Sequence, residues 1–370
     1  MLGLTYYGHV NDISGYAEAN RNLVRQLVAV GVRVKLYPLG IDLPDAGLPP
    51  ELLEFYHSLR STPENPRWPV LQAMIALGFR PQPNRYNIGL TMIETTGLPP
   101  VWVGACNRMQ EIWVPSEFNR RVFMASGVDG NKIQVLPFGV DCERFRPGLP
   151  PLEIPGRQGF TFLSVFDWRP RKGFEFLLQA YSQEFTIRDN VCLVLKISNT
   201  AKVETSRRLR EMRRYLRSGA MGPKVILLEQ PLSYTEMPRL YASGDCFVLP
   251  TRGEGWNLPA IEAMASGLPV ICTAWSAHME YMNHSNSLLL NMERLEQVKP
   301  SGSWTDQIYS GSRWAKPSVN HLRILMRKVY ENQEECRFLG AKARQDVLAK
   351  FTWQQSASRV RERLEQLVQR

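Results

Sequence analysis

The stretch CFVLPTRGEGWNLPAIEAMASGLPVICT, residues 246–273, decides the fold. An apolar run of strand length comes first, then a glycine-bearing turn, a helical segment and a second apolar run, which together predict a compact βαβ unit. Glu254 lies in the turn just past the first strand. Glu262 is expected about two turns into the helix, because each helical residue advances roughly 1.5 Å. One carboxylate can therefore face the centre of a site while the other lies deeper along it.

The predicted helix begins near Asn257. Its first backbone N–H groups have no partner within the helix, and they lie at the positive end of the helix dipole. This end of the helix is therefore a candidate site for a phosphate group.

Strand-length apolar runs alternate with helical periods along the rest of the chain, which predicts parallel sheets built from repeated βα units. The expected strands are 2–7, 32–37, 87–93, 111–114 and 133–136 in the first half, and 160–166, 191–197, 224–228, 246–249 and 269–273 in the second. Ser116 is placed as the N-cap of a helix that runs to about Ser126. The fold class is α/β, with two Rossmann-like domains whose strand ends face a cleft.

Residues 146–159 interrupt this alternation with four prolines and three glycines, so we place the domain boundary there. The predicted domains are 1–150 and 151–350. Residues 351–370 are expected to form a helix that returns to the N-terminal domain.

The net charge of +10 suggests an anionic partner. Lys and Arg number 14 against 13 Asp and Glu in residues 1–150, and 31 against 22 in residues 151–370, so the excess lies in the second half. Its densest part is the arginine-rich segment 207–217, which has the pattern of a solvated amphipathic helix. No nucleic-acid-binding motif accompanies it, so we expect no nucleic acid partner, while a small phosphate-bearing ligand stays open.

Other classes of protein lack support in the sequence. The six cysteines are scattered, which gives no zinc site or disulfide framework. No stretch of about 18 apolar residues lacks a charge and the N-terminal residues do not resemble a signal peptide, so a cytoplasmic protein is expected. Neither Gly-x-Gly-x-x-Gly nor a P-loop motif occurs, so nicotinamide dehydrogenases and P-loop nucleotidases lose their usual basis.

Glu254 through Glu262, followed by AMASGLPVI, resembles the Glu-x7-Glu signature of retaining glycosyltransferases with the GT-B fold, family-4 (group 1) type. Further similar segments are SGYAEANRNLVRQLVAVGVRV at 14–34, EIWVPSEFNRRVFMASGV at 111–128, VLPFGVDCERFRP at 135–147 and FTW at 351–353. Only about residues 40–85 have no match.

The resemblance implies transfer of a sugar from a nucleotide-diphosphate sugar, with retention at the anomeric carbon. The first domain would be the acceptor side and the second the donor side. Glu262 would hold the donor ribose and Glu254 the transferred sugar, since an ionised carboxylate accepts two hydroxyl donors at once. Four residues would lie near the sugar and diphosphate: Gly255, Trp256, Asn257 and Leu258.

The sequence contains no Asp-x-Asp, so neither a metal nor a resident cofactor is expected, and side chains must supply the positive charge at the diphosphate. Lys172, at the start of a predicted helix, is the candidate. The arginine that precedes this lysine in the family corresponds here to Phe166. Arg169 or Arg171 is therefore expected to compensate, with Arg169 in the catalytic set and Arg171 in the donor-binding set.

On the acceptor side, Glu94 stands where relatives place a histidine, and it either contacts the acceptor or caps a helix. His9 and His278 are further candidates for the cleft, although a lone histidine is more often packed or on the surface. Gly15, by contrast, is placed in the donor-binding set: it either lets the backbone approach a phosphate or sugar closely or is an ordinary turn glycine.

The acceptor is an unidentified glycan, lipid-linked or small molecule, and the near-neutral first half gives no support to a peripheral membrane contact. Phe166, Glu94 and Phe138 depart from the family's pattern. They keep open an alternative to a transfer enzyme, namely a sugar-nucleotide-binding partner or regulatory subunit that has lost transfer activity. A sugar-nucleotide epimerase is disfavoured by the intact Glu-x7-Glu pattern.

Overall fold

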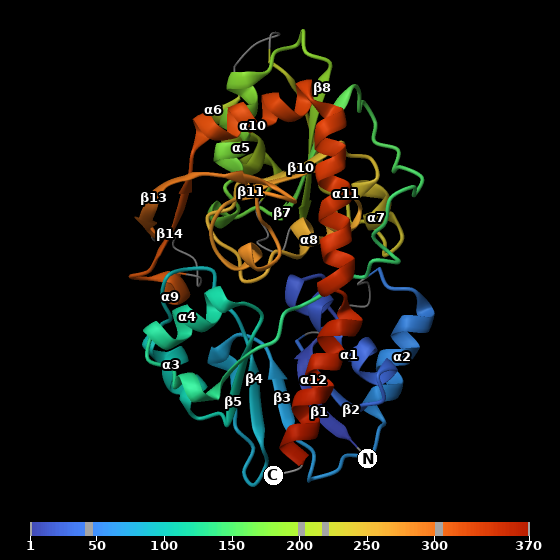
Figure 1. Cartoon of the computed structure of the whole chain (residues 1–370), viewed down its shortest axis with the longest axis vertical. Coiled ribbons are helices and arrows are strands. Elements are labelled where there is room, and N and C mark those ends of the chain that lie inside the picture. Colours follow the sequence, from blue (N-terminus) through green and yellow to red (C-terminus); the bar gives the residue numbers. More distant parts are fainter. Residues whose placement is uncertain (1, 41–46, 199–203, 217–221, 300–305, 369–370) are drawn as a thin grey trace. The chain divides into compact units, whose positions relative to one another are not determined.

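The computed structural model describes residues 2–40, 47–198, 204–216, 222–299 and 306–368. The chain divides into two compact units (Figure 1). Unit 1 comprises Met1–Asp141, Gln297–Arg313 and Lys350–Arg370, and unit 2 comprises Cys142–Glu296 and Trp314–Ala349.

Unit 1 is built on a six-stranded parallel sheet with the strand order β2-β1-β3-β4-β5-β6. The strands are β1 (Gly3–His9), β2 (Arg33–Leu39), β3 (Val70–Ala73), β4 (Asn87–Leu90), β5 (Glu111–Val114) and β6 (Ile133–Val135). The helices are α1 (Gly15–Ala29), α2 (Pro50–Arg60), α3 (Pro100–Asn107), α4 (Glu117–Ala125), α9 (Asp306–Tyr309) and α12 (Trp353–Val368). Ser14 and Ser116 cap α1 and α4 by accepting hydrogen bonds from Ala17 N and Asn119 N. Sequence patterning missed β3, in the stretch without family resemblance.

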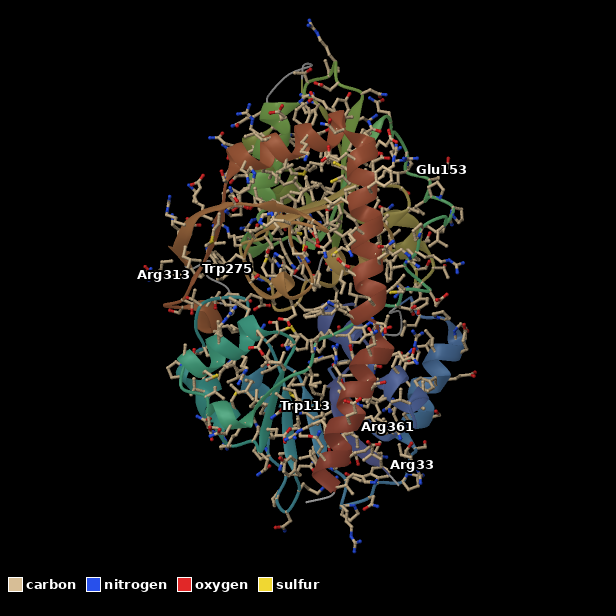
Figure 2. All side chains as sticks on the ribbon, viewed as in Figure 1. Arg33, Trp113, Glu153, Trp275, Arg313 and Arg361 are labelled. Atoms are coloured by element: carbon tan, nitrogen blue, oxygen red, sulfur yellow. The ribbon has the colours of Figure 1, made fainter. Side chains whose placement is uncertain are left out.

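The C-terminal helix α12 packs on α1 within unit 1. Ser356 Oγ donates to Pro137 O at 2.8 Å, and Arg361, labelled in Figure 2, donates to Val30 O at 2.7 Å. Phe138 is buried, with its ring centroid 5.5 Å from that of Trp353. The side chain that departs from the family pattern at position 138 therefore serves this packing.

Unit 2 is built on a second six-stranded parallel sheet, with the order β12-β11-β10-β7-β8-β9. Its strands are β7 (Phe160–Asp167), β8 (Val191–Ser198), β9 (Lys224–Leu228), β10 (Cys246–Leu249), β11 (Val270–Thr273) and β12 (Leu288–Leu290). Its helices are α5 (Phe174–Glu184), α6 (Thr205–Tyr215), α7 (Glu236–Tyr241), α8 (Leu258–Ala265), α10 (Val319–Glu331) and α11 (Gln333–Lys350). Strands β13 (Met292–Gln297) and β14 (Arg313–Pro317) pair where the chain passes between the units.

The proline-rich stretch 146–159, predicted as the boundary, belongs to unit 2. Leu152 N donates to Arg239 O at 2.9 Å, and Ser243 Oγ donates to Leu152 O at 2.9 Å, so this segment is bonded to α7 and the turn after it. The units divide earlier, between Asp141 and Cys142, because Phe145 already packs against Tyr241 with ring centroids 5.5 Å apart. Residues 297–313, predicted for the second domain, belong to unit 1, where Ser312 Oγ donates to Gly97 O at 3.2 Å.

The arginine-rich helix α6 differs from the solvated helix that the sequence predicts. Arg208 is only 2% exposed and forms an ion pair with Glu229. Met212 is also buried, while Arg207 remains on the solvent side. Part of the positive charge in this helix is therefore neutralised inside unit 2.

Candidate functional site

The loop between β10 and α8 carries the two predicted carboxylates. Asn257 precedes α8 in the left-handed backbone region, with φ 76° and ψ 65°, so the helical geometry begins only at Leu258. Glu262 is consequently the fifth helical residue. It lies just over one turn into the helix and not two, as the sequence spacing predicts.

Glu254 is almost completely buried, at 4% exposure, and its carboxylate is surrounded by donors. Lys172 Nζ lies 2.7 and 2.9 Å from its two oxygens, Arg171 Nη1 lies 3.0 Å from Oε2, and Thr251 Oγ1 donates to Oε1 at 2.8 Å. Burial alone would raise the pKa of Glu254, but the charges of Lys172 and Arg171 outweigh it and lower the pKa to about 2. Glu254 is therefore ionised at neutral pH.

Lys172 and Arg171 reach Glu254 because their segment packs directly on the loop after β10. They lie on a short 3-10 helix, Pro170–Lys172, that ends at Gly173 with φ 68°. A Cβ at Gly173 would come within 1.9 Å of Pro250 O, so only glycine allows this approach. Arg252 N donates to Arg171 O at 2.7 Å and joins the two segments.

The structure distinguishes the two arginines proposed from the sequence. Arg171 contacts Glu254 and donates to Gly253 O at 2.6 Å, whereas Arg169 forms an ion pair with Asp167. Phe166, in the position of the family's arginine, is buried, with its ring 5.9 Å from Trp168 in a stacked arrangement. The structure thus brings Lys172, Arg171 and Glu254 together, and it pairs Arg169 with a different carboxylate.

Glu262 is buried on α8 and accepts a hydrogen bond from Tyr241 Oη at 2.7 Å on its Oε2 atom. Tyr241 ends α7 and is fully buried. Its hydroxyl therefore orients the carboxylate that the family resemblance assigns to the donor ribose.

The backbone between the two glutamates is held by a second tyrosine. Tyr281 Oη lies 2.9 Å from Trp256 O and 2.8 Å from Asn257 O, and its ring packs on the Trp256 indole at 5.1 Å. The Tyr281 hydroxyl therefore restrains the backbone of the segment from Gly255 to Leu258, which is predicted to lie near the sugar and diphosphate.

Arg252 anchors the same loop on another side. Its guanidinium pairs with Glu175 at 2.7 Å and also with Glu296, and it lies over the rings of Phe176 and Trp314 at 4.6 and 5.3 Å. Such a network restrains the backbone immediately before Glu254.

His278 is fully buried, and its Nε2 lies 2.6 Å from Thr273 O. Because the carbonyl can only accept, Nε2 carries the proton. Burial lowers the pKa of His278, so the ring is neutral and packed rather than exposed to solvent.

The predicted acceptor-side residues, His9 and Glu94, lie in unit 1, and so does Gly15 from the predicted donor-binding set. His9 Nδ1 is 3.2 Å from Asp12, and Tyr309 Oη donates to Glu94 Oε2 at 2.8 Å. Gly15 is the first residue of α1, and a Cβ there would meet no atom within 4 Å, so the space beside its backbone is open.

Sequence reasoning missed five residues that shape the site: Tyr241, Thr251, Arg252, Ser276 and Tyr281. Thr251 and Arg252 lie within the quoted stretch, but neither residue type at these positions signals a contact with a carboxylate. Tyr241 and Ser276 are 21 and 22 residues from the glutamates whose segments they bind. No local pattern reports such a contact.

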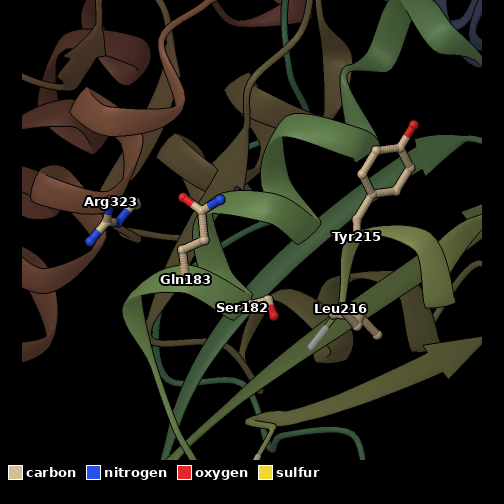
Figure 3. A pocket seen from close by; sticks show the side chains of 5 residues that line it. All are labelled: Ser182, Gln183, Tyr215, Leu216 and Arg323. Carbon is tan, nitrogen blue, oxygen red and sulfur yellow. The ribbon is translucent and has the colours of Figure 1, made fainter. Parts of the chain in front are cut away.

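A cavity of about 420 Å³ in unit 2 is lined by other residues, namely Ser182, Gln183, Tyr215, Leu216 and Arg323 (Figure 3). Within the described ranges, no group of three or more His, Cys, Asp or Glu side chains could hold a metal ion. In the same ranges, no helix is long and apolar enough to span a membrane.

Residues 157–298 match the family model described as "Glycosyl transferases group 1". The chain is 26% identical over 233 residues to the MMP alpha-(1->4)-mannosyltransferase of Mycolicibacterium hassiacum, an alignment that covers 62% of this chain and 47% of that protein. The mannosylfructose-phosphate synthase of Agrobacterium fabrum is 29% identical over 154 residues, an alignment that covers 40% of this chain and 34% of that protein. The chain thus spans half or less of the length of these curated relatives.

Two solved structures have the same fold over almost their entire length. Anabaena Alr3699/HepE, in complex with UDP and glucose, matches with a TM-score of 0.70 at 14% identity, covering 99% of this chain and 100% of that one. The sucrose-phosphate synthase of Thermosynechococcus elongatus matches with a TM-score of 0.68 at 17% identity, covering 100% and 99%. The fold is therefore the two-domain, Rossmann-like GT-B fold, and the predicted fold class is confirmed.

The sheet topology and the solved structures together define the class as proteins of the GT-B fold, built on two Rossmann-like units. Residues 157–298, which contain the Glu-x7-Glu pattern, match the group 1 glycosyltransferases, and this match supports the family that the pattern indicates.

Proposed function

We propose that this protein is a retaining, metal-independent glycosyltransferase of the family-4 type, which moves a sugar from a nucleotide-diphosphate sugar to an acceptor. The observation that carries the proposal is the buried cluster of Glu254, Lys172 and Arg171 near the start of α8, with Glu262 one turn along that helix. Relatives named as mannosyltransferases and a structural neighbour in complex with UDP and glucose support it.

Formal charge favours an anionic ligand at this cluster. Lys172 and Arg171 place two cationic side chains beside the ionised Glu254. Cations attract the negative charge of a diphosphate, and the N-terminal dipole of α8 would add to the attraction.

Each residue then has a distinct task. Glu262, oriented by Tyr241, would accept hydrogen bonds from the ribose, and Glu254 would accept them from hydroxyls of the transferred sugar. Breaking the sugar–phosphate bond leaves negative charge on the diphosphate, which Lys172 and Arg171 would stabilise more strongly in the transition state than in the ground state. In this proposal Arg171, and not Arg169, takes the place of the family's second cation.

The test combines binding with transfer. UDP-, GDP-, ADP- and dTDP-sugars are first screened by thermal shift, and the stabilising donor is then incubated with a set of glycan, lipid-linked and small-molecule acceptors. A product whose NMR spectrum shows the anomeric configuration of the donor, formed equally well in EDTA, supports the proposal. Binding without transfer or donor hydrolysis would instead support a sugar-nucleotide-binding subunit, and inversion would refute the retaining mechanism.

A further inference from the structure

Ser276 adopts a backbone conformation that is nearly reserved for glycine. It follows β11 in unit 2 with φ 83° and ψ −158°, and it is 4% exposed. A side chain in this region of φ and ψ is strained, and such strain persists only where the surrounding structure imposes it. Glycine would relieve the strain, so a serine at this position suggests that its hydroxyl has a use.

The hydroxyl holds the backbone of Glu254. Glu254 N donates to Ser276 Oγ at 2.9 Å, and Ala277 N donates to Glu254 O at 3.3 Å. Both backbone polar groups of Glu254 are thus attached to two consecutive residues of the loop after β11. The conformation of Ser276 is what allows its side chain and the next N–H group to meet the same residue.

The carboxylate of Glu254 depends on this attachment. Its oxygens lie at hydrogen-bond distance from Lys172 and Thr251, and a shift of the backbone at 254 would change both distances. Without Ser276 Oγ, a buried N–H group would also lose its acceptor, which favours movement of the loop toward another partner.

We propose that Ser276 is a positioning residue that fixes Glu254 for sugar transfer, and this inference rests on the proposed function. Ser276 acts through Glu254 and needs no contact with the donor. The strain at Ser276 is the cost of placing a hydroxyl where the backbone geometry alone would favour glycine.

The inference predicts that Ser276→Gly lowers turnover without a matching loss of fold stability. Removing the strain should raise the thermal unfolding midpoint or leave it unchanged. Loss of the hydroxyl should lower kcat by about 100-fold, the scale expected when a reacting group is misplaced by about 1 Å. The KM for the donor should change little, because Glu262 and Tyr241 are untouched.

The experiment compares the full-length wild type with Ser276→Gly, Ser276→Ala and the control Asn84→Gly. Asn84 also has a positive φ, 57°, but it is exposed and lies in unit 1, so its variant relieves strain without touching the Glu254 loop. Hydrogen exchange is followed by mass spectrometry in a peptide covering 251–257, together with the unfolding midpoint, kcat and donor KM. Both Ser276 variants should exchange faster at this peptide, and Asn84→Gly should not.

Protection of the peptide and a kcat like that of the wild type in Ser276→Gly would overturn the inference. If Ser276→Ala fails to fold, Ser276→Gly still decides, because glycine tolerates the backbone conformation. A wild type without transfer activity would refute the proposed function, whereas the exchange of the 251–257 peptide would still show whether Ser276 holds Glu254.

Discussion

The charge balance around Glu254 predicts that loss of Glu254 and loss of Lys172 lower the free energy of unfolding by different amounts. Glu254→Gln removes the carboxylate that Lys172 and Arg171 share, and breaking a buried ion pair by removing one partner costs about 3–5 kcal/mol of unfolding free energy. Lys172→Met leaves a neutral pair of Glu254 and Arg171, so its cost should be that of lost charged hydrogen bonds, about 1.5–3 kcal/mol. Adding Lys172→Met to Glu254→Gln removes one of two like charges. The double variant should therefore cost less than the sum of the single variants, by about 1–3 kcal/mol.

This double-mutant cycle is measured by urea unfolding, followed by fluorescence at pH 7, of the wild type, the two single variants and the double variant. The pair Lys316–Glu293 provides a matched control, because its N–O distance is also 2.7 Å but its side chains are 29% and 39% exposed. Lys316→Met should cost less than about 1 kcal/mol. Additive costs at Lys172 and Glu254, or a cost of Glu254→Gln no larger than that of the surface control, would refute the reasoning.

Four further outcomes are expected. Lys172→Met should lower turnover by about two to three powers of ten, the scale of losing a preorganised donor, and Arg171→Met but not Arg169→Met should have a comparable effect in the same assay. Glu262→Gln should weaken donor affinity measured by calorimetry, by roughly 1.5–3 kcal/mol for each charge-assisted bond to ribose, and an unchanged affinity would contradict the ribose assignment. The pKa of Glu254 is 4.5 in the unfolded chain and about 2 in the folded protein. The stabilisation that the ionised carboxylate gives the fold is therefore complete above pH 4.5 and is lost as the pH falls toward 2. Urea unfolding measured between pH 4.5 and 2 should accordingly show that the difference in unfolding free energy between wild type and Glu254→Gln becomes smaller as the pH falls. A constant difference would contradict the lowered pKa of Glu254. Transfer activity should survive EDTA, and its complete, metal-reversible loss would refute the metal-independent mechanism.

The sheets and the position of the central carboxylates could be predicted from the sequence because they depend on local patterns. Apolar runs such as 111–114 and 246–249 coincide with β5 and β10, since a strand buried on both faces is nearly continuous in apolar residues. The four-residue β3 and the three-residue β12 were missed, because runs this short show too little periodicity to be separated from the loops around them.

The contacts that orient the site could not be predicted in the same way. Tyr241 reaches Glu262 from another helix, and Ser276 reaches Glu254 from another loop, so both depend on tertiary packing. The positive φ of Ser276 is also hidden in the sequence, because serine does not mark such a position as glycine would. Likewise, the spacing of arginines in α6 gave no sign that Arg208 turns inward to Glu229.

The most direct test of the account is the binding of nucleotide sugars to the wild type and to Glu262→Gln, measured by thermal shift. A donor at 100 times its Kd stabilises the native state by about 2.7 kcal/mol. For a domain of this size, that corresponds to roughly 5–10 °C in the unfolding midpoint. The account predicts such a shift with at least one nucleotide-diphosphate sugar, and a clearly smaller shift in Glu262→Gln. No shift with any nucleotide sugar at saturating concentrations, or equal shifts in the two proteins, would contradict it.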